Sequence, residues 1–550
     1  MLSAETWQYL YVAIAVWLAS YLIKRHLDPL NAIPTVGPSA PLLSYLGAIQ
    51  YIRDAESLLR EGYQKVGFVS IHCNATLMSP PQYYGTVFKV AMLDGWLAVF
   101  TGPQLIDELR RSSDDELSAV EGTSQVLQLR HTLGPGVDDQ FHVAVVRDKL
   151  TRSLQVLCPD VLDEVSAAFQ EYIPAKEDEW VGVRIFPVVQ QVVARASNRV
   201  IVGLPKCRDP EYLKVAVNFT NDVFITSFII NLFPDFLKPI IGRMTTMVSK
   251  NKHILMPMIV PMLQQRQKMF EQYGDGWEDK PRDLLQWILD EGREKGTPFD
   301  NIVEKVLLVN FGAIHTSSVT FTHALYNLAA HTEYIQPVRE EVESIISEEG
   351  WSKASLGKMR KLDSLLKESM RLADGSLLSM FRKAVKDVTL SDGTRIPRGT
   401  LVAAASATAH TDGTRYPAPD TFDPFRFARL REGGVGAATK HQLVNTSVDF
   451  LTFGHGKHAW SVLGLSPLST LRILVLTRRT NSPGRFFAAN ELKIMLAYLV
   501  LNYDIKFEEE GKRPPNIRFG PANLPSHNAI VLFRKRRDVP KFALPASQHA

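Results

Sequence analysis

Three short segments in the second half of the chain carry charged residues and glycines that could hold a flat ligand. KESMRL places Glu368 and Arg371 three residues apart, on one face of a helix, where a carboxylate and a guanidinium can pair. TFDPFRF supplies Arg426 within an aromatic loop broken by proline, and this guanidinium could join the pair. FGHGKHA contains two glycines, which allow the backbone to approach a flat ligand closely. Each segment alone is common, but the three in this order form a specific combination.

The elements that must position these segments are mainly helical. Apolar residues recur three and four positions apart in residues 300–331 and 362–373, which predicts one long and one shorter helix. Residues 380–410 alternate and contain the turn signals SDG and PRG, which predicts a small β-region. Helical spacing returns in residues 485–503, and strand-like stretches follow at 505–510 and 528–536. The predicted fold class is therefore mainly α with a small β-region.

Composition excludes several classes of protein. The 550 residues are 45% hydrophobic and 22% charged, which is typical of a globular protein with a large core. A formal net charge of +4 is too small for this length to indicate a nucleic-acid partner. The three cysteines lack CxxC spacing, so neither a disulfide framework nor a zinc site is indicated, and a reducing compartment fits best.

The N-terminus predicts a single membrane helix. Residues 7–23, WQYLYVAIAVWLASYLI, are apolar with interspersed aromatic residues and are followed by Lys24, Arg25 and His26. The alternative, a cleaved signal peptide, fits less well because the positive charges follow the apolar stretch and no small-residue cleavage site closes it. The positive-inside rule then leaves the rest of the chain cytosolic. The predicted organisation has three parts: an anchor (1–26), a Pro/Gly linker (27–40) and one large domain (41–550).

The motifs resemble those of the cytochrome P450 family, over essentially the whole chain after the anchor. In that family an ExxR helix, a Phe-x-Pro-x-Arg-Phe loop and a haem loop of the form Phe-Gly-x-Gly-x-His-x-Cys-x-Gly occur in the same order. The resemblance implies the cytochrome P450 fold, in which Glu368, Arg371 and Arg426 form a structural triad.

The resemblance also implies a haem site. It places His458 and Arg382 near the haem propionates, and a weaker correspondence in FHVAVVRDKLT gives His142 or Arg147 the same role. For the last two, a solvated helix face is the alternative. The cofactor-binding residues implied in this way are Arg382, Phe453, Gly456, His458, Gly484, His142 and Arg147.

The long helix corresponds to the family's oxygen-activating helix. The family pattern is Ala/Gly-Gly-x-Asp/Glu-Thr, and residues 312–316 read Gly-Ala-Ile-His-Thr. Thr316 matches and is the expected catalytic hydroxyl, whereas His315 replaces the acid and could relay protons, given the unperturbed pKa of histidine near 6.5. A His-Thr pair here resembles a fungal branch that includes ent-kaurene oxidases. The alternative is an ordinary packed helix.

The cysteine that should ligate the haem iron is missing. A thiolate is the ligand that favours O–O cleavage in this family, yet residues 208–550 contain no cysteine. Cys158 and Cys207 lack the Phe-Gly loop and are interpreted as plain structural residues.

The codons suggest an unspliced intron in the gene model. A segment that begins with GT and ends with AG can be read from within the codon of Trp460 to within the codon of Ser482. Its removal joins the first two bases of the Trp460 codon, TG, to the last base of the Ser482 codon, a pyrimidine. The joined codon is a cysteine codon, which restores FGHGKHA-Cys-PGRFF. The codons of Val66 and Gln82 also allow GT and AG boundaries around a second segment, 66–82, and its removal restores the family-like EGYQKYYGTVFKV. The alternative is that both are real insertions.

The expected activity is insertion of one oxygen atom from O₂ into an unactivated C–H bond of a lipophilic molecule. The expected substrates are polycyclic terpenoids or steroids, in secondary metabolism or detoxification. The expected partners are haem, a membrane-bound reductase that passes on electrons from NADPH, and the endoplasmic reticulum membrane. Two alternatives stay open: a haem-free, decayed membrane-anchored binding protein, and a haem-thiolate isomerase or dehydratase that needs no reductase. The second alternative is weakened by the presence of Thr316.

Overall fold

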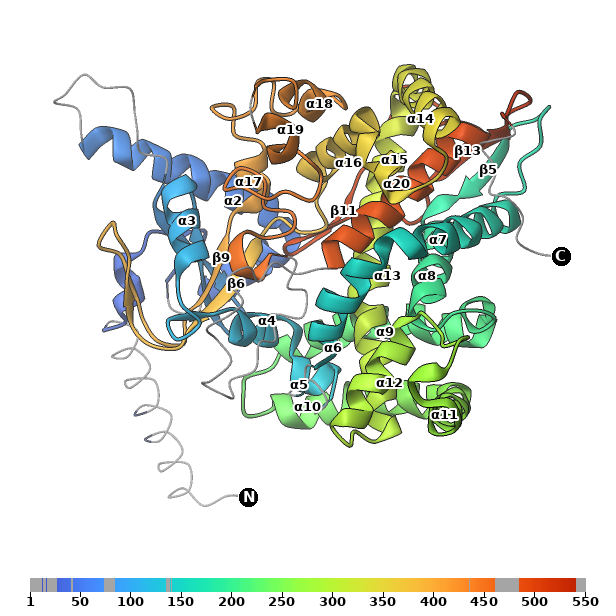
Figure 1. The fold of residues 1–550 in the computed structure, drawn as a ribbon. Coiled ribbons are helices and arrows are strands. Elements are labelled where there is room, and N and C mark those ends of the chain that lie inside the picture. Colours follow the sequence, from blue (N-terminus) through green and yellow to red (C-terminus); the bar gives the residue numbers. More distant parts are fainter. Residues whose placement is uncertain are drawn as a thin grey trace, which may run out of the picture.

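A long central helix, α13 (Phe299–Ala330), organises the fold (Figure 1). In the computed structural model, residues 12, 16, 27–40, 43–73, 85–134, 139, 141–434, 436–459 and 484–540 are described, without the side chains of 65–73 and 275. Every residue of α13 from Phe321 to Ala330 is buried, because other helices surround this half on all sides. A helix that is apolar all round is expected to be buried in this way.

Helices form most of the described chain, and they lie mainly to one side of the sheet in Figure 1. They are α2 (Leu43–Cys73), α3 (Pro103–Arg111), α4 (Ala119–Leu127), α5 (Leu129–Thr132), α6 (Phe141–Val145), α7 (Thr151–Tyr172), α8 (Ile185–Ile201), α9 (Pro210–Asn231), α10 (Lys238–Thr245), α11 (Val248–Tyr273), α12 (Leu284–Glu294), α14 (Ile335–Glu349), α15 (Lys353–Lys358), α16 (Arg360–Leu372), α17 (Ser406–His410), α18 (Arg426–Leu430), α19 (Ala437–Lys440) and α20 (Gly484–Asn502). Shorter turns are η1 (Pro29–Ala32), the π-helical η3 (Val146–Leu150), η4 (Lys206–Arg208), η5 (Gly274–Gly276), η6 (Thr332–Tyr334) and η7 (Gly456–His458).

The main sheet is mixed and has the strand order β1-β2-β3-β9-β6-β4. Its strands are β1 (Thr35–Val36), β2 (Val87–Met92), β3 (Gly95–Phe100), β4 (Leu117–Ser118), β6 (Ser379–Ala384) and β9 (Leu401–Ala404). The smaller sheets pair β10 (Tyr503–Lys506) with β13 (Ile530–Lys535) and β5 (Val181–Arg184), β11 (Ile517–Phe519) with β12 (Ala522–Leu524), and β7 (Val388–Thr389) with β8 (Arg395–Ile396). The main sheet thereby joins residues 35–118 to the segment 379–404, far along the chain.

The apolar core is divided between the helices and the sheet. One cluster of buried residues joins α7, α8, α14, α16 and α20 to the C-terminal half of α13. A second joins α9, α11 and α12 to the N-terminal half of α13. Two smaller clusters pack α2 and α3 against the faces of the main sheet. Since α13 belongs to both large clusters, its position is fixed along its whole length.

The predicted elements that position the motifs are confirmed. The long helix, the ExxR helix and the helix after the haem loop are α13, α16 and α20, and the β-region of 380–410 contains β6 to β9. Residues 508–510 differ from the prediction, because these three glutamates are exposed and turn away after β10 instead of extending the strand. Residues 35 and 36 of the predicted linker pair with β2 in the main sheet.

Parts of the predicted anchor and insertions lie outside the described residues. This applies to residues 7–23 except 12 and 16, and to all of 460–482. The backbone of 66–73, the start of the other predicted insertion, continues helix α2. Among the described residues, α9 is the one helix that is long and apolar enough to cross a membrane, and 56% of its apolar window is buried in the protein. Packing in the core accounts for that apolar composition.

Candidate functional site: a buried triad and the loop it holds

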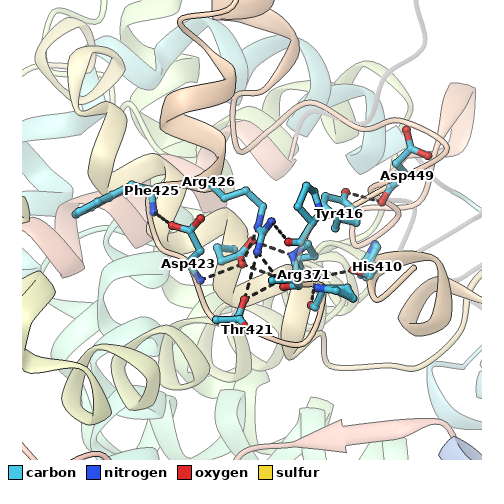
Figure 2. Close-up of polar contacts among 12 residues, drawn as sticks. Arg371, His410, Tyr416, Thr421, Asp423, Phe425, Arg426 and Asp449 are labelled. Carbon is cyan, nitrogen blue, oxygen red and sulfur yellow. Dashed lines mark hydrogen bonds and ion pairs between the residues drawn. The ribbon is translucent and has the colours of Figure 1, made fainter. Parts of the chain in front are cut away.

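Glu368, Arg371 and Arg426 form a buried charge triad (Figure 2). Arg371 donates from Nε and Nη2 to the two carboxylate oxygens of Glu368, each at 2.8 Å, and Arg426 Nε donates to Oε1 of Glu368 at 3.1 Å. The i, i+3 spacing on α16 brings the first two together, and the turn before α18 brings Arg426 to them. The structure thus brings together the three residues predicted as a structural triad.

The triad carries one more positive than negative charge, and backbone carbonyls compensate for the difference. Arg371 Nη1 donates to the carbonyls of His410 and Pro419 at 2.6 Å, and Arg426 Nη1 donates to the carbonyl of Pro417 at 2.6 Å. Buried charges are tolerated when they are paired and hydrogen-bonded in this way. The triad therefore fixes the path of the chain from 410 to 426.

Two residues outside the three motifs, His410 and Tyr416, connect the triad to the glycine loop. Tyr416 packs its ring 4.9 Å from the guanidinium of Arg371 and donates its hydroxyl to the carbonyl of Asp449 at 2.8 Å. The backbone N–H of Leu451 donates to Nε2 of His410 at 2.8 Å. Burial, with the charge of Arg371, lowers the pKa of His410 to about 3, so the ring is neutral and Nε2 can accept. The order HTDGTRYP gave no sign of these contacts, because neither residue belongs to a recognised spacing.

The glycine loop itself is tightly packed. Phe453 is buried in the large helical cluster, and Gly454 and Gly456 both have positive φ, at +67° and +83°. A Cβ added to Gly456 would lie 2.3 Å from Cγ of Arg110. Glycine is therefore required here for both its backbone conformation and its small size. The last predicted loop residue, Gly484, is the first residue of α20.

His458 is paired with Asp114 in the structure. Nε2 of His458 lies 2.9 Å from Oδ1 of Asp114, and Nζ of Lys457 lies 3.0 Å from Oδ2. Burial acts to raise the pKa of the Asp114 carboxyl, but the close His458 ring and the hydrogen bond and charge of Lys457 outweigh it and hold the pKa far below its usual range. These contacts fasten η7 to the segment before β4.

Arg382 lies in the same region as Asp114 and His458. Its side chain is buried on β6, and Nη1 donates to the carbonyl of Phe381 at 2.8 Å. Burial lowers the pKa of Arg382 to about 10, against the opposing charge of Asp114. No ion pair joins this guanidinium to a carboxylate in the described part of the chain. A buried cation without a direct anionic partner fits an anionic group such as a propionate.

His142 and Arg147 lie in different surroundings in the structure. His142 on α6 is buried, and neither ring nitrogen has a hydrogen-bond partner among the described residues. Burial, with the charge of Lys305, lowers its pKa to about 3. Arg147 on η3 is partly exposed and donates to both carboxylate oxygens of Asp148 at 3.1–3.2 Å. Of the two, His142 therefore has the unpartnered nitrogens that a buried ligand could use.

Thr316 and His315 follow an open space on α13 by one helical turn. A Cβ added to Gly312 would meet no atom within 4 Å, and residues 315 and 316 follow one helical turn later. Oγ1 of Thr316 donates to the carbonyl of Gly312 at 3.0 Å, a bond inside the helix. Burial, with the charge of His527, lowers the pKa of His315 to about 4, well below the unperturbed value assumed from the sequence. His315 is therefore neutral at physiological pH.

Neither remaining cysteine of the described chain fits an iron ligand. Cys158 on α7 and Cys207 on η4 are both buried, and burial raises the thiol pKa of Cys158 to about 11 and of Cys207 to about 12. Neither belongs to the loop 451–459. Arg382 and His142 thus suit the acidic groups of a haem, and the glycine loop suits its flat face, but the chain as written supplies no thiolate there.

Comparison with known proteins decides the family. The cytochrome P450 family model matches residues 72–459. The chain belongs to the cytochrome P450 family. The predicted resemblance is confirmed, and the match ends at the residue after which the iron-ligating cysteine is expected.

Relatives of this cytochrome P450 are fungal monooxygenases. It is 45% identical to cytochrome P450 monooxygenase 151 of Postia placenta over 533 residues, which cover 96% of this chain and 98% of that protein. It is 31% identical to ent-kaurene oxidase P450-4 of Gibberella fujikuroi over 541 residues, covering 96% and 97%. The solved structure of retinoic acid-bound cyanobacterial CYP120A1 superposes with a TM-score of 0.61 at 17% identity, covering 92% of this chain and 99% of that one. This last likeness confirms the cytochrome P450 fold.

Proposed function

We propose that the natural protein is a haem-thiolate monooxygenase that inserts one oxygen atom from O₂ into a C–H bond of a lipophilic polycyclic molecule. The observation that carries this proposal is the fastening of the glycine loop to the buried triad through His410 and Tyr416, close to the buried Arg382. The loop is held rigidly where a flat cofactor would be bound, and the family membership supports the reaction class.

Each residue of the site has a separate task in this proposal. Arg382 and His142 would hold the acidic groups of the cofactor, since both side chains are buried and the ring nitrogens of His142 have no partner among the described residues. The glycines of residues 453–459 let the backbone approach the flat face. The Thr316 hydroxyl can leave its bond to the Gly312 carbonyl and hold a proton over the open space beside that glycine. When bound through a thiolate, haem supplies the oxygen activation.

Because the iron-ligating cysteine is missing, we define a restored protein in which both predicted insertions are removed. Lys65 is joined to Tyr83, and Ala459 is joined through a new cysteine to Pro483. Two observations support it: the family match ends at 459, and Ala459 is buried at the end of a loop that is otherwise complete. The proposal is that the restored protein is the natural one and that residues 66–82 and 460–482 come from unspliced introns.

Spectroscopy of both chains tests the proposal. The reduced carbon monoxide complex of the restored protein should show the strongly red-shifted Soret band of thiolate ligation, and the chain as written should not. If the chain as written gives that band at full occupancy, the intron hypothesis is wrong. Transcript sequencing is the second check, because a message that encodes residues 460–482 would favour the haem-free binding protein instead.

Location, partners and substrate complete the proposal. The apolar stretch 7–23 anchors the protein in the endoplasmic reticulum membrane with the catalytic domain in the cytosol, and a reductase supplies electrons from NADPH. The ent-kaurene oxidase relative favours rigid terpenoids or steroids. Apolar pockets discriminate weakly between similar hydrocarbons, so several ring systems should be accepted. Incubation with terpenoids, steroids and fatty acids tests this, and turnover of fatty acids alone would contradict it.

A further inference from the structure

His315 occupies an unusual position on α13. Its ring packs against Phe224 of α9, with the centroids 4.9 Å apart, and Phe224 packs in turn against Phe311 at 5.5 Å. These contacts fix the imidazole between two helices. The residue remains partly accessible even though α13 crosses the core of the protein.

One ring nitrogen of His315 has no hydrogen-bond partner among the described residues. This atom, Nδ1, is buried. A buried polar atom without a partner destabilises a protein unless a ligand or an ordered water satisfies it. His315 is also neutral at physiological pH, so its ring offers one donor and one acceptor instead of a positive charge.

Open space lies one helical turn before this ring, beside Gly312. Gly312 is on the same face of α13, and a Cβ there would meet nothing within 4 Å. Aromatic side chains supply the apolar wall, and His315 supplies a polar group at its edge. A mainly apolar site with one fixed polar group is the usual arrangement for orienting a small lipophilic ligand.

We propose that His315 determines substrate specificity by hydrogen-bonding a hydroxyl or carbonyl group that the substrate already carries. This inference rests on the proposed function and narrows its substrate class from polycyclic hydrocarbons to oxygenated ones. An earlier oxidation or hydration of the hydrocarbon must then supply the substrate. His315 acts here as a positioning residue, and Thr316 keeps the task of holding the proton.

Two substitutions separate the hydrogen bond from the packing. His315→Phe keeps an aromatic ring against Phe224 and removes both nitrogens. His315→Asn places an amide near the position of Nδ1 and should retain the hydrogen bond. Thr316→Val is the matched control, because it removes a polar group from the next position of α13 without changing the imidazole.

The measurement is equilibrium binding of paired ligands by calorimetry, on the restored protein and in parallel on the chain as written. The pairs are ent-kaurene with ent-kaurenol and cholestane with cholestanol. His315→Phe should weaken binding of the alcohols about tenfold and leave the hydrocarbons unchanged, as loss of one hydrogen bond predicts. His315→Asn and Thr316→Val should preserve the preference for the alcohols.

The binding measurements test the role of His315 separately from the proposed function. Equal weakening of alcohols and hydrocarbons by His315→Phe, or no preference for alcohols in the unsubstituted protein, would overturn the role of His315. Failure of the proposed function shows instead in the carbon monoxide spectrum of the same samples. A restored protein with the red-shifted band and no alcohol preference would thus contradict only this inference.

Discussion

The backbone N–H of Leu451 donates to Nε2 of His410 at 2.8 Å, and the carbonyl of His410 accepts from Arg371 at 2.6 Å. One residue at the end of α17 therefore connects the triad directly to the segment that leads into the glycine loop. Because the ring is buried and neutral, Nε2 accepts and the proton resides on Nδ1.

We predict that His410→Phe loosens the glycine loop without unfolding the protein. The phenyl ring can fill the site but cannot accept from Leu451, which leaves a buried N–H without a partner, at a cost of about 1–3 kcal/mol. Amide hydrogen exchange of residues 451–459 should accelerate, and exchange in α13 should not. His253→Phe, at an exposed position, is the control; unchanged exchange in the loop of the His410 variant would contradict the prediction.

The triad should be far more important for stability than a surface pair on the same helix. Arg426→Ala leaves Glu368 with one guanidinium partner fewer in a buried site, and we expect a loss of about 3–5 kcal/mol in the free energy of unfolding. Arg429→Ala breaks an exposed pair with Asp423 and should cost less than about 1 kcal/mol. Urea unfolding of both variants provides the comparison, and similar losses would refute a special role for the triad.

Gly456→Ala should combine backbone strain with a steric clash. Gly393 is the matched control, since it has nearly the same φ, +85° against +83°, and nothing within 4 Å of an added Cβ. Thermal unfolding should show a larger loss for Gly456→Ala than for Gly393→Ala. The double substitution Arg110→Ala/Gly456→Ala should recover the difference, because it removes the atom that the new methyl group meets.

Glu491 on α20 should make stability depend on pH. It is buried, its Oε1 accepts from Ser197 at 2.7 Å, and burial raises its pKa from 4.5 to about 8. Between these pH values the folded state keeps a proton that the unfolded state has lost. Stability therefore falls as pH rises from 4.5 to about 8, by about 1.4 kcal/mol per pH unit for one proton.

Glu491→Gln should remove that part of the pH dependence. Relative to the unsubstituted protein, the variant should become more stable as pH rises through this window, as measured by urea unfolding at several pH values. Glu432→Gln changes an exposed carboxylate and should leave the curve as it was. Parallel curves for the Glu491 variant and the unsubstituted protein would show that Glu491 is ionised when folded.

Thr316→Ala tests the proposed proton-holding hydroxyl. In the restored protein this variant should retain the red-shifted Soret band, since Thr316 bonds only within α13 among the described contacts. More of the NADPH consumed should then appear as hydrogen peroxide and less as product. Peroxide yield per NADPH is the measurement, and unchanged coupling would refute the assignment of Thr316.

Sequence reasoning predicted what depends on spacing and missed what depends on distant contacts. The i, i+3 pair on α16 and the long apolar pattern of α13 are local, so both were predictable. The roles of His410, Tyr416 and Asp114 arise from partners far along the chain, such as Leu451, and no local pattern reveals them. Likewise, the lowered pKa of His315 results from burial between α9 and α13, which spacing alone does not show.

One half of α13 belongs to one large core cluster and the other half belongs to the second. The two clusters should therefore not unfold independently. A protease cut within residues 299–330 would require both clusters to open at once, whereas a cut at the exposed turn around Gly393 would require neither. The amides of Phe321 to Ala330 should accordingly be among the last to exchange with deuterated solvent. The protein should therefore resist division into two fragments that fold separately, even though its sheet and its helices form different layers.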